Sequence, residues 1–432
     1  MQPMLRGSRW LAALLAVVAT ALPAASAHAA TGLLGGVDVP GLSRGSVPAE
    51  ADHEIAQAKA LHARLVRIDF PWSVLEPTGP SLDPHAIAFT DRLIADAEAA
   101  GIKVVATVAS TPCWASSAPA SLLRACTTGR SDAAGSWPPQ DDSTYAAVLA
   151  ALAQRYGARL TAIEVWNEPD QANEDYFAGP EKAVRYARLL RAAYPAVKAV
   201  APQITVLGGS LVGSNGAFLK ALYAAGIKGY YDGLSVHYYN LTLGSVRAIR
   251  EAQLANGDSK PLWLDEFGWT SCWPHRKVEQ EQACVTPQVQ ALNLRNALRE
   301  MSRAPYLAAA TVYKLQDSRG ETFGALTTSG AHKPSFQGLR EAFDRPTGPY
   351  SAVTLRLRRR GSHVIASGSG PVGDFMNLEA FQGTRLRYRA LFTLNRFNEY
   401  SLTLPAVLGT HGLTVRVYQY WTGTSRAARK NI

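Results

Sequence analysis

Short apolar runs alternate with longer segments whose apolar residues recur at helical spacing along residues 33–343. The runs are rich in Val, Ile, Leu and Ala, which is typical of strands buried on both faces of a parallel sheet. We predict eight strands, at 33–39, 64–69, 102–109, 160–166, 203–209, 233–238, 260–265 and 307–315. We predict helices at 48–62, 83–101, 142–157, 180–200, 215–225, 244–255, 287–303 and 334–343. Eight strand–helix units predict an α/β fold, a closed (β/α)8 TIM barrel, over residues 30–345.

Local signals agree with several of these boundaries. Asp83-Pro84 has the order of a helix cap followed by a first-turn proline, and Gly101 is a good helix stop. An open, doubly wound parallel sheet is the alternative architecture. It is less well supported, because no Gly-x-Gly-x-x-Gly turn follows an early strand.

The pattern changes after Arg345-Pro346-Thr347-Gly348-Pro349. Helical spacing disappears, and short alternating runs separated by turn residues predict strands at 353–360, 363–367, 385–394, 401–404 and 414–420. We therefore expect a small antiparallel, sandwich-like β module over residues 346–424, packed against the barrel. Residues 425–432 are expected to form a solvated tail.

The N-terminus has the order of a secretory signal peptide over residues 1–29. Arg6 and Arg9 precede an apolar run at 10–22, and Ala27-His28-Ala29 fits a small-x-small cleavage site. The run is too short for a membrane span of about 20 residues, although an uncleaved anchor is the alternative. We expect a secreted protein, extracellular or associated with the cell envelope, with no membrane span after cleavage.

The four cysteines fall into two local couples, which fits an exported protein. We expect disulfides between Cys113 and Cys126 and between Cys272 and Cys284, each within one loop region. A zinc site is the alternative, but the spacings are not those of a metal motif.

The net charge of +10 is unevenly distributed. Residues 346–432 hold twelve Arg and Lys against three Asp and Glu, so the basicity belongs to the β module. Such a surface could bind an anionic polysaccharide or a cell-envelope polymer, or it could simply keep the protein in solution. Nucleic acid is not an expected partner, because no binding motif is present.

Two of the predicted strands end in glutamate at a loop. One reads Ile163-Glu164-Val165-Trp166-Asn167-Glu168-Pro169 and the other Pro261-Leu262-Trp263-Leu264-Asp265-Glu266-Phe267-Gly268-Trp269. Strand ends at the C-terminal face are where a TIM barrel carries its active site. The strands are the fourth and seventh, so Glu168 and Glu266 can face each other across a central cleft. Glycoside hydrolysis requires two carboxyl groups placed in this way.

These motifs resemble the acid/base and nucleophile strands of clan A glycoside hydrolases, most closely those of family 39. The similarity extends to Arg67-Ile68-Asp69 with Trp72 and Leu75-Glu76-Pro77, to Thr111-Pro112-Cys113-Trp114-Ala115, and to Asp232-Gly233-Leu234-Ser235-Val236-His237-Tyr238-Tyr239. It covers roughly residues 33–343. The combination is far more specific than Asn-Glu-Pro alone.

The resemblance implies a role for each strand-end residue. Glu168 would be the general acid/base, with a raised pKa, and Glu266 the nucleophile, kept ionised by Arg67. Asn167 would donate or accept at the sugar 2-hydroxyl. A retaining double displacement follows, with the carboxyl groups about 5–5.5 Å apart.

Further residues have alternative roles in this interpretation. His237 could touch the sugar or be a core histidine, and Tyr239 or Tyr238 could bond the nucleophile. Glu164 is expected in the barrel interior, and Asp265 is expected to point away from Glu266 because neighbouring strand residues face opposite ways. Trp114, Trp137, Trp269 and Trp273 are loop aromatics that could stack on sugars or simply pack.

The sequence thus predicts a secreted retaining glycoside hydrolase that acts on a polysaccharide or oligosaccharide. The alternatives are a carbohydrate-binding protein without activity and a transglycosylase that uses the same two glutamates. The mechanism requires no metal or organic cofactor. The sugar, the linkage, and exo or endo action are not encoded in these motifs.

Overall fold

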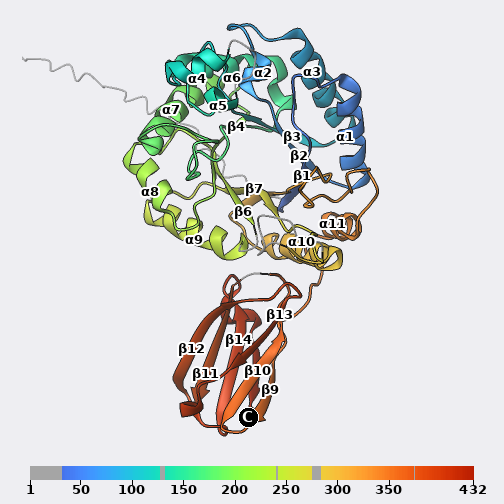
Figure 1. Cartoon of the computed structure of the whole chain (residues 1–432), viewed down its shortest axis with the longest axis vertical. Helices are drawn as coiled ribbons and strands as arrows, with labels where there is room; N and C mark the ends of the chain where they lie inside the picture. The colour runs from blue at the N-terminus through green and yellow to red at the C-terminus, as the bar shows by residue number, and fades with distance from the viewer. Residues whose placement is uncertain (1–31, 127–131, 240–241, 275–283, 374) are drawn as a thin grey trace, which may run out of the picture. The chain divides into compact units, whose positions relative to one another are not determined.

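Eight parallel strands close into a barrel in the order β1 to β8 (Figure 1). The structure is a computed structural model that describes residues 32–126, 132–239, 242–274, 284–373 and 375–432. The barrel strands are β1 (Leu34–Asp38), β2 (Leu65–Asp69), β3 (Lys103–Val108), β4 (Ala162–Val165), β5 (Thr205–Leu211), β6 (Gly233–Tyr239), β7 (Leu262–Gly268) and β8 (Leu307–Val312). The TIM barrel is therefore confirmed, with every predicted barrel strand present.

Helices surround this barrel and pack their apolar faces on the outside of the strands (Figure 1). They are α1 (Pro48–Ala60), α3 (Pro84–Ala100), α6 (Asp142–Tyr156), α7 (Lys182–Val200), α8 (Ala217–Ala224), α9 (Thr242–Ala255), α10 (Pro287–Met301) and α11 (Pro334–Asp344). Three short helices in loops were not predicted: α2 (Trp72–Leu75), α4 (Ala120–Ala125) and α5 (Asp132–Gly135). The Asp83 carboxylate caps α3, and Gly101 ends it with φ 69°.

The interior of the barrel is layered by side-chain polarity. Apolar side chains from six strands form its lower layer: Leu65, Val105, Ala162, Leu207, Trp263 and Ala309. Two residues further along their strands, Arg67, Thr107, Glu164 and Asp265 are buried at the next level. Because side chains two apart in a strand share a face, this order places charged groups above the apolar layer, toward the strand ends.

The C-terminal module is built from two antiparallel sheets around a separate apolar core. One sheet has the order β13 (Glu399–Thr403), β10 (His363–Ser369), β9 (Arg356–Arg360). The other has the order β12 (Arg385–Thr393), β11 (Phe375–Gln382), β14 (Leu413–Gln419), β15 (Ala428–Asn431). The prediction of a sandwich-like β module is confirmed, but it omitted β11 and β15. The expectation of a solvated tail at 425–432 is wrong, because Ala428–Asn431 pairs with β14.

Hydrogen bonds join helix α10 to loops of the module. Asn296 donates to the Pro371 carbonyl at 2.6 Å, and Asn398 donates to Asn293 at 2.6 Å. Among the described residues, no helix combines the length and the apolar character needed to cross a membrane. The predicted signal peptide at 1–29 lies outside the described residues.

Candidate active site

A β-bulge in β7 shapes the site. Leu264 pairs with Ala310 and Phe267 with Val312, so Asp265 and Glu266 together lie opposite the single residue Thr311. A bulge of this kind turns an extra side chain toward the face it would otherwise avoid. Asp265 and Glu266 consequently both reach Arg67, at 3.4 Å and 2.8 Å. The expectation that Asp265 points away from Glu266 is wrong for this reason.

Arg67, from β2, is the cation that holds these groups together. Its guanidinium donates to Glu164 at 2.9 Å, to Glu266 at 2.8 Å and to the Asn167 side-chain oxygen at 2.8 Å. The side chain is almost completely buried, and each of its three nitrogens donates to a protein acceptor. It therefore positions Glu266 and Asn167. Because the oxygen of Asn167 is taken, its amide nitrogen is the group left to donate.

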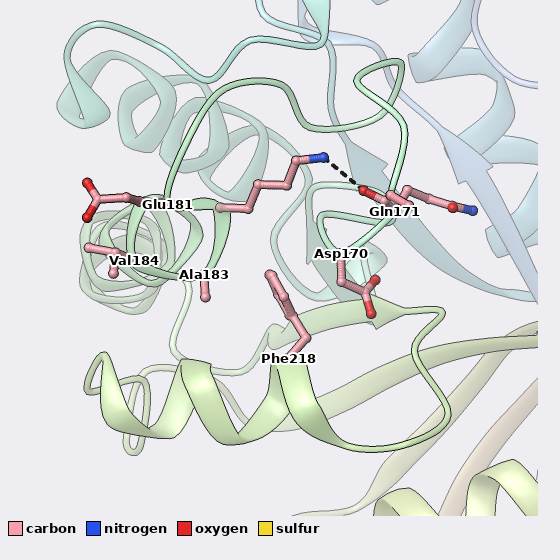
Figure 2. A pocket seen from close by; sticks show the side chains of 8 residues that line it. Asp170, Gln171, Glu181, Ala183, Val184 and Phe218 are labelled. Carbon is pink, nitrogen blue, oxygen red and sulfur yellow. Dashed lines mark hydrogen bonds between the residues drawn. The ribbon is translucent and has the colours of Figure 1, made fainter.

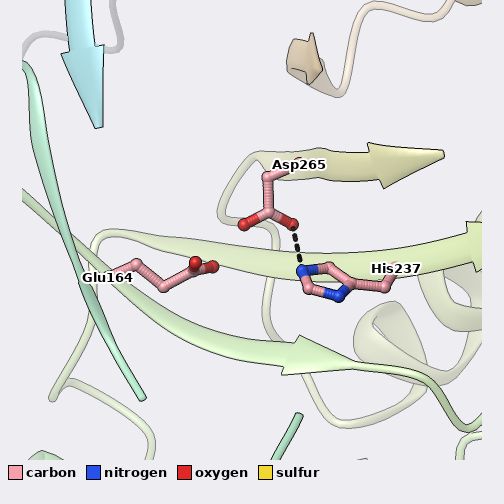
Figure 3. Close-up of side chains that lie close together, drawn as sticks. All are labelled: Glu164, His237 and Asp265. Carbon is pink, nitrogen blue, oxygen red and sulfur yellow. Dashed lines mark ion pairs between the residues drawn. The ribbon is translucent and has the colours of Figure 1, made fainter. Parts of the chain in front are cut away.

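His237, from β6, bridges the two candidate catalytic carboxylates. Its Nδ1 atom lies 2.9 Å from Glu168 Oε1 and 3.3 Å from Glu266 Oε2. On the other side of the ring, Nε2 lies 3.5 Å from Asp265 Oδ1 (Figure 3). Glu164 is held nearby by the Ser235 and Thr107 hydroxyls. His237 thus contacts both candidate catalytic carboxylates as well as Asp265.

The protonation pattern differs from the one the sequence leads us to expect. Burial raises the pKa of the Glu266 carboxyl above its ordinary value, and the charges of His237 and Arg67 offset only part of this effect. Burial also favours a raised pKa for Glu168, but the hydrogen bond and charge of His237 outweigh it and bring that pKa below its ordinary value. In this structure, the pKa of Glu168 is lowered and that of Glu266 is raised, which is the reverse of the expected order. The closer approach of His237 to Glu168 contributes to this reversal.

His237 can exert this effect because it is cationic. Burial lowers the pKa of its imidazole, but the charges of Glu266 and Asp265 act in the opposite direction and place the pKa well above its ordinary value. The pKa of Asp265 is itself raised well above its ordinary value, by burial and then by the charge of Glu164.

Glu168 follows β4 on a strained piece of backbone. Trp166 and Glu168 have φ of 72° and 48°, in the left-handed region that non-glycine residues seldom adopt. Such strain tends to be kept at functional sites, where the surrounding structure enforces it. Gln171 donates to Glu168 Oε2 at 2.9 Å, a contact that the sequence did not suggest.

The loop after Glu168 is anchored at both ends. Asp170 accepts hydrogen bonds from the amides of Val212 and Gly213, and Lys182 donates to the Gln171 carbonyl at 2.8 Å. A hollow of about 470 Å³ lies along this loop, with Asp170, Gln171, Val184 and Phe218 among its lining residues (Figure 2).

Two cavities open over the candidate catalytic centre and share Asp69. One, of about 260 Å³, is lined by groups that include Arg67, Asp69 and Glu266. The other, of about 210 Å³, is lined by groups that include Asp69, Asn167 and Tyr176. Because Asp69 lines both, the cavities are adjacent, and the cleft has room for a small polar ligand.

Of the tyrosines and tryptophans named from the sequence, one contacts a candidate catalytic carboxylate, and others are packed inside the protein. Tyr239 donates its hydroxyl to Glu266, whereas the ring of Tyr238 is buried and its hydroxyl lies 3.5 Å from the Gly213 carbonyl. Trp269 is 2% exposed and packs edge-on against Phe267, which favours the packing role over stacking on a sugar.

Trp114 is half-buried and is engaged in packing within the protein. It packs edge-on against Trp72 and donates its ring N–H to the Glu76 carbonyl at 2.8 Å. These contacts favour a packing role for the ring.

Both predicted disulfides are present. Cys113 is bonded to Cys126 in the loop after β3, and Cys272 to Cys284 in the loop after β7. They restrain two of the loops at the C-terminal end of the barrel, where the candidate catalytic groups lie.

Donor atoms that could hold a metal ion are grouped here as well. One atom from each of Glu168, His237 and Glu266 lies within 4.8 Å of the others, and the same holds for Glu164, His237 and Asp265. Arg67 already lies 2.8–2.9 Å from Glu266 and Glu164. A metal ion would therefore add positive charge beside a guanidinium and a cationic imidazole, which is unfavourable at these distances.

Comparison with known proteins agrees with this geometry. Residues 136–326 match the family model described as the glycosyl hydrolase catalytic core. That segment includes both Glu168 and Glu266. No curated protein matches the chain in sequence.

Several solved structures share the fold. A family 39 glycoside hydrolase from the gut symbiont Bacteroides cellulosilyticus WH2 is 18% identical, over 87% of this chain and 81% of that one, with a TM-score of 0.55. A GH39 β-xylosidase from Caulobacter crescentus is 17% identical, over 87% and 94%, with a TM-score of 0.54. An endo-β-1,4-mannanase from Thermotoga petrophila is 12% identical, over 92% and 96%, with a TM-score of 0.52. At these identities the likeness concerns the fold.

The resemblance to clan A glycoside hydrolases is therefore confirmed by a matched segment and by architecture. The matched segment supports a glycosidase. Residues 136–326 match the glycosyl hydrolase catalytic core, on a barrel whose fold is similar to that of family 39 and related glycoside hydrolases.

Proposed function

We propose that this protein is an exported, retaining glycoside hydrolase that cleaves O-glycosidic bonds of an oligosaccharide or polysaccharide. The observation that carries the proposal is the placement of Glu168 and Glu266. They stand at the ends of β4 and β7, are both buried, and approach within 4.8 Å through one oxygen each, with His237 between them. This separation is close to the roughly 5–5.5 Å typical of retaining enzymes and shorter than the roughly 6.5–9.5 Å of inverting ones, which favours covalent double displacement over direct attack by water.

In the proposed reaction, Glu266 attacks the anomeric carbon while Glu168 gives its proton to the leaving oxygen. Glu168 then takes a proton from water, which releases the sugar from Glu266. Arg67 holds one oxygen of Glu266, and the Tyr239 hydroxyl holds the other. Asn167, fixed by Arg67, is aligned to donate to a sugar hydroxyl.

A movement of His237 would convert the resting arrangement into the reactive one. In the structure, Nδ1 of His237 lies closer to Glu168, at 2.9 Å, than to Glu266, at 3.3 Å. A small shift of the ring toward Glu266 when sugar enters would lower the pKa of the nucleophile and raise that of the acid. Both changes are in the direction that the reaction requires.

The experiment is hydrolysis of a panel of aryl glycosides and oligosaccharides by four proteins. Glu168→Gln and Glu266→Gln should each lower kcat/KM by at least about 100-fold, because each variant loses proton transfer or nucleophilic attack. Glu98→Gln changes an exposed glutamate on helix α3, outside the cleft, and should stay within about twofold of the wild type. Binding without turnover across the panel, or an active glutamine variant, would contradict the proposal.

Stereochemistry tests the retaining step separately. Proton NMR of the first product should show the anomeric configuration of the substrate. An inverted product would exclude Glu266 as the nucleophile while leaving hydrolysis itself intact. Growth of longer products when acceptor sugar is added would assign transglycosylation to the same residues.

A further inference from the structure

The C-terminal module concentrates unpaired positive charge at one edge. Strand β9 carries Arg356, Arg358 and Arg360 at alternating positions, and all three are exposed. Leu355 and Leu357 belong to the side that packs on the core of the module, so the three arginines project from the opposite, outer face. Side chains two residues apart in a strand are spaced by about 6.7 Å, which gives a row of evenly placed guanidinium groups.

The neighbouring strand β10 adds no carboxylate to this row. Opposite the three arginines on β10 lie Ser367, Ile365 and His363, and the same face continues to Ser401 and Thr403 on β13. The one described carboxylate of β13 is Glu399, at the other end of that strand. Within the described part of the chain, no carboxylate forms an ion pair with any of these three arginines.

The other sheet treats its arginines differently. Glu379 on β11 is buried, and it pairs with Arg389 and Arg416 on the two flanking strands. The Tyr418 hydroxyl bonds the same carboxylate at 3.1 Å. Two arginines thus share one carboxylate on that face, whereas the three arginines along β9 have no such partner among the described residues.

We infer that the β9 edge is a binding site for a linear anionic polysaccharide, whose carboxylate or sulfate groups pair with Arg356, Arg358 and Arg360. A guanidinium binds such oxyanions through two parallel hydrogen bonds, and a rigid strand presents three of them in register. The hydroxyls of Ser367, Ser401 and Thr403 on the same face could bond sugar hydroxyls. The site is independent of the barrel chemistry, and it would hold the protein on a charged glycan.

A simpler role must be separated from this one. Charged side chains on an edge strand also prevent strand-to-strand aggregation. That role requires charge but no particular ligand, so it predicts no selective binding.

The test is binding of the full-length protein to polygalacturonate, dextran sulfate and neutral dextran, with a DNA duplex and phosphatidylglycerol vesicles as further probes. Arg356→Gln/Arg358→Gln should weaken binding to the anionic glycans by at least about tenfold and lower the salt dependence of log K by about two. Arg385→Gln/Arg387→Gln on β12 removes the same charge from another strand, where a β-bulge interrupts the regular spacing, and binding should stay within about twofold of the wild type. The stronger of the two anionic glycans identifies the preferred anion.

Several results would overturn the inference. They are no binding to either anionic glycan, equal losses in the two double variants, binding to neutral dextran, or tighter binding to DNA or vesicles. Arg356→Lys/Arg358→Lys keeps the charge and the edge protection but loses the paired donors, so it should bind more weakly than the wild type and more tightly than the glutamine variant. Circular dichroism and thermal unfolding of both double variants should match the wild type; a glutamine variant that binds weakly only because its module is unfolded would also overturn the inference. The Glu168→Gln variant should bind the anionic glycans as tightly as the wild type. Glycan binding by the module can therefore be measured separately from hydrolysis by the barrel.

Discussion

Glu54, on helix α1, is a buried carboxyl without a compensating cation. Its side chain belongs to a residue that is only 6% exposed, and its Oε2 atom has no hydrogen-bond partner among the described residues. Burial, and secondarily the charge of Glu50, raises the pKa of Glu54 to about 8. The folded protein therefore keeps the Glu54 proton at pH values where the unfolded chain has already released it.

This difference makes stability depend on pH with a known sign. The unfolded carboxyl loses its proton near its ordinary pKa of 4.5 and the folded one near 8, so stability falls as pH rises between these values. One pKa unit corresponds to about 1.4 kcal/mol, so the loss reaches about 3 kcal/mol at pH 7 and about 5 kcal/mol when complete. Glu54→Gln has no proton to lose and should be more stable than the wild type by this amount.

The assay is thermal unfolding of both proteins across the pH range. A barrel of roughly 300 residues unfolds with an entropy of about 0.6 kcal/mol/K, so 3 kcal/mol corresponds to a Tm increase of about 5 °C at pH 7. The increase should vanish near pH 4, where Glu54 is protonated in both states. Glu98→Gln, an exposed change on α3, should shift Tm little at any pH. Parallel Tm curves for Glu54→Gln and the wild type would refute the reasoning.

Three further predictions concern the site and its loops. His237→Asn removes the cation that lowers the pKa of both catalytic carboxyls, so both limbs of the pH profile of kcat/KM should move to higher pH. Limbs at unchanged pH would show that His237 does not control the pKa of Glu168. Tyr239→Phe removes the hydroxyl donor to Glu266 and should lower kcat/KM by about tenfold or more while raising the acidic limb, whereas a pure KM effect would contradict this contact. Cys113→Ala opens a bridge spanning 13 residues and should lower the free energy of unfolding by about 3 kcal/mol in a denaturant titration; an unchanged midpoint would contradict it.

The module shows where patterns in the sequence are ambiguous. Strand β11 reads Phe-Met-Asn-Leu-Glu-Ala-Phe-Gln, and Met, Leu, Glu and Ala are good helix formers with little preference for strands. Its alternation of buried and partly exposed residues becomes decisive only when β12 and β14 pair on both sides. Strand β15 is polar and largely exposed, so its place in the sheet rests on backbone pairing with β14, which leaves no hydrophobic signature.

The sequence by itself determined the barrel and the identity of its two strand-end glutamates. Period-2 and period-3.6 patterns are local properties, and so are the proline and glycine signals that end each element. Glu168 and Glu266 could be named because a strand that ends in a carboxylate at the barrel mouth is visible in a single stretch of chain. Arg67 and His237 could be named because the motifs that contain them resemble those of clan A glycoside hydrolases.

Tertiary structure alone decided how these groups act on one another. The bulge that turns both Asp265 and Glu266 inward arises from the pairing of β7 with β8, which no single strand encodes. The pKa order of Glu168 and Glu266 follows from two distances to one histidine ring and from burial, quantities that exist only after the chain has closed. Trp269 lies beside the site in sequence yet is enclosed by packing. Burial and interatomic distance control electrostatics, and both are properties of the folded chain.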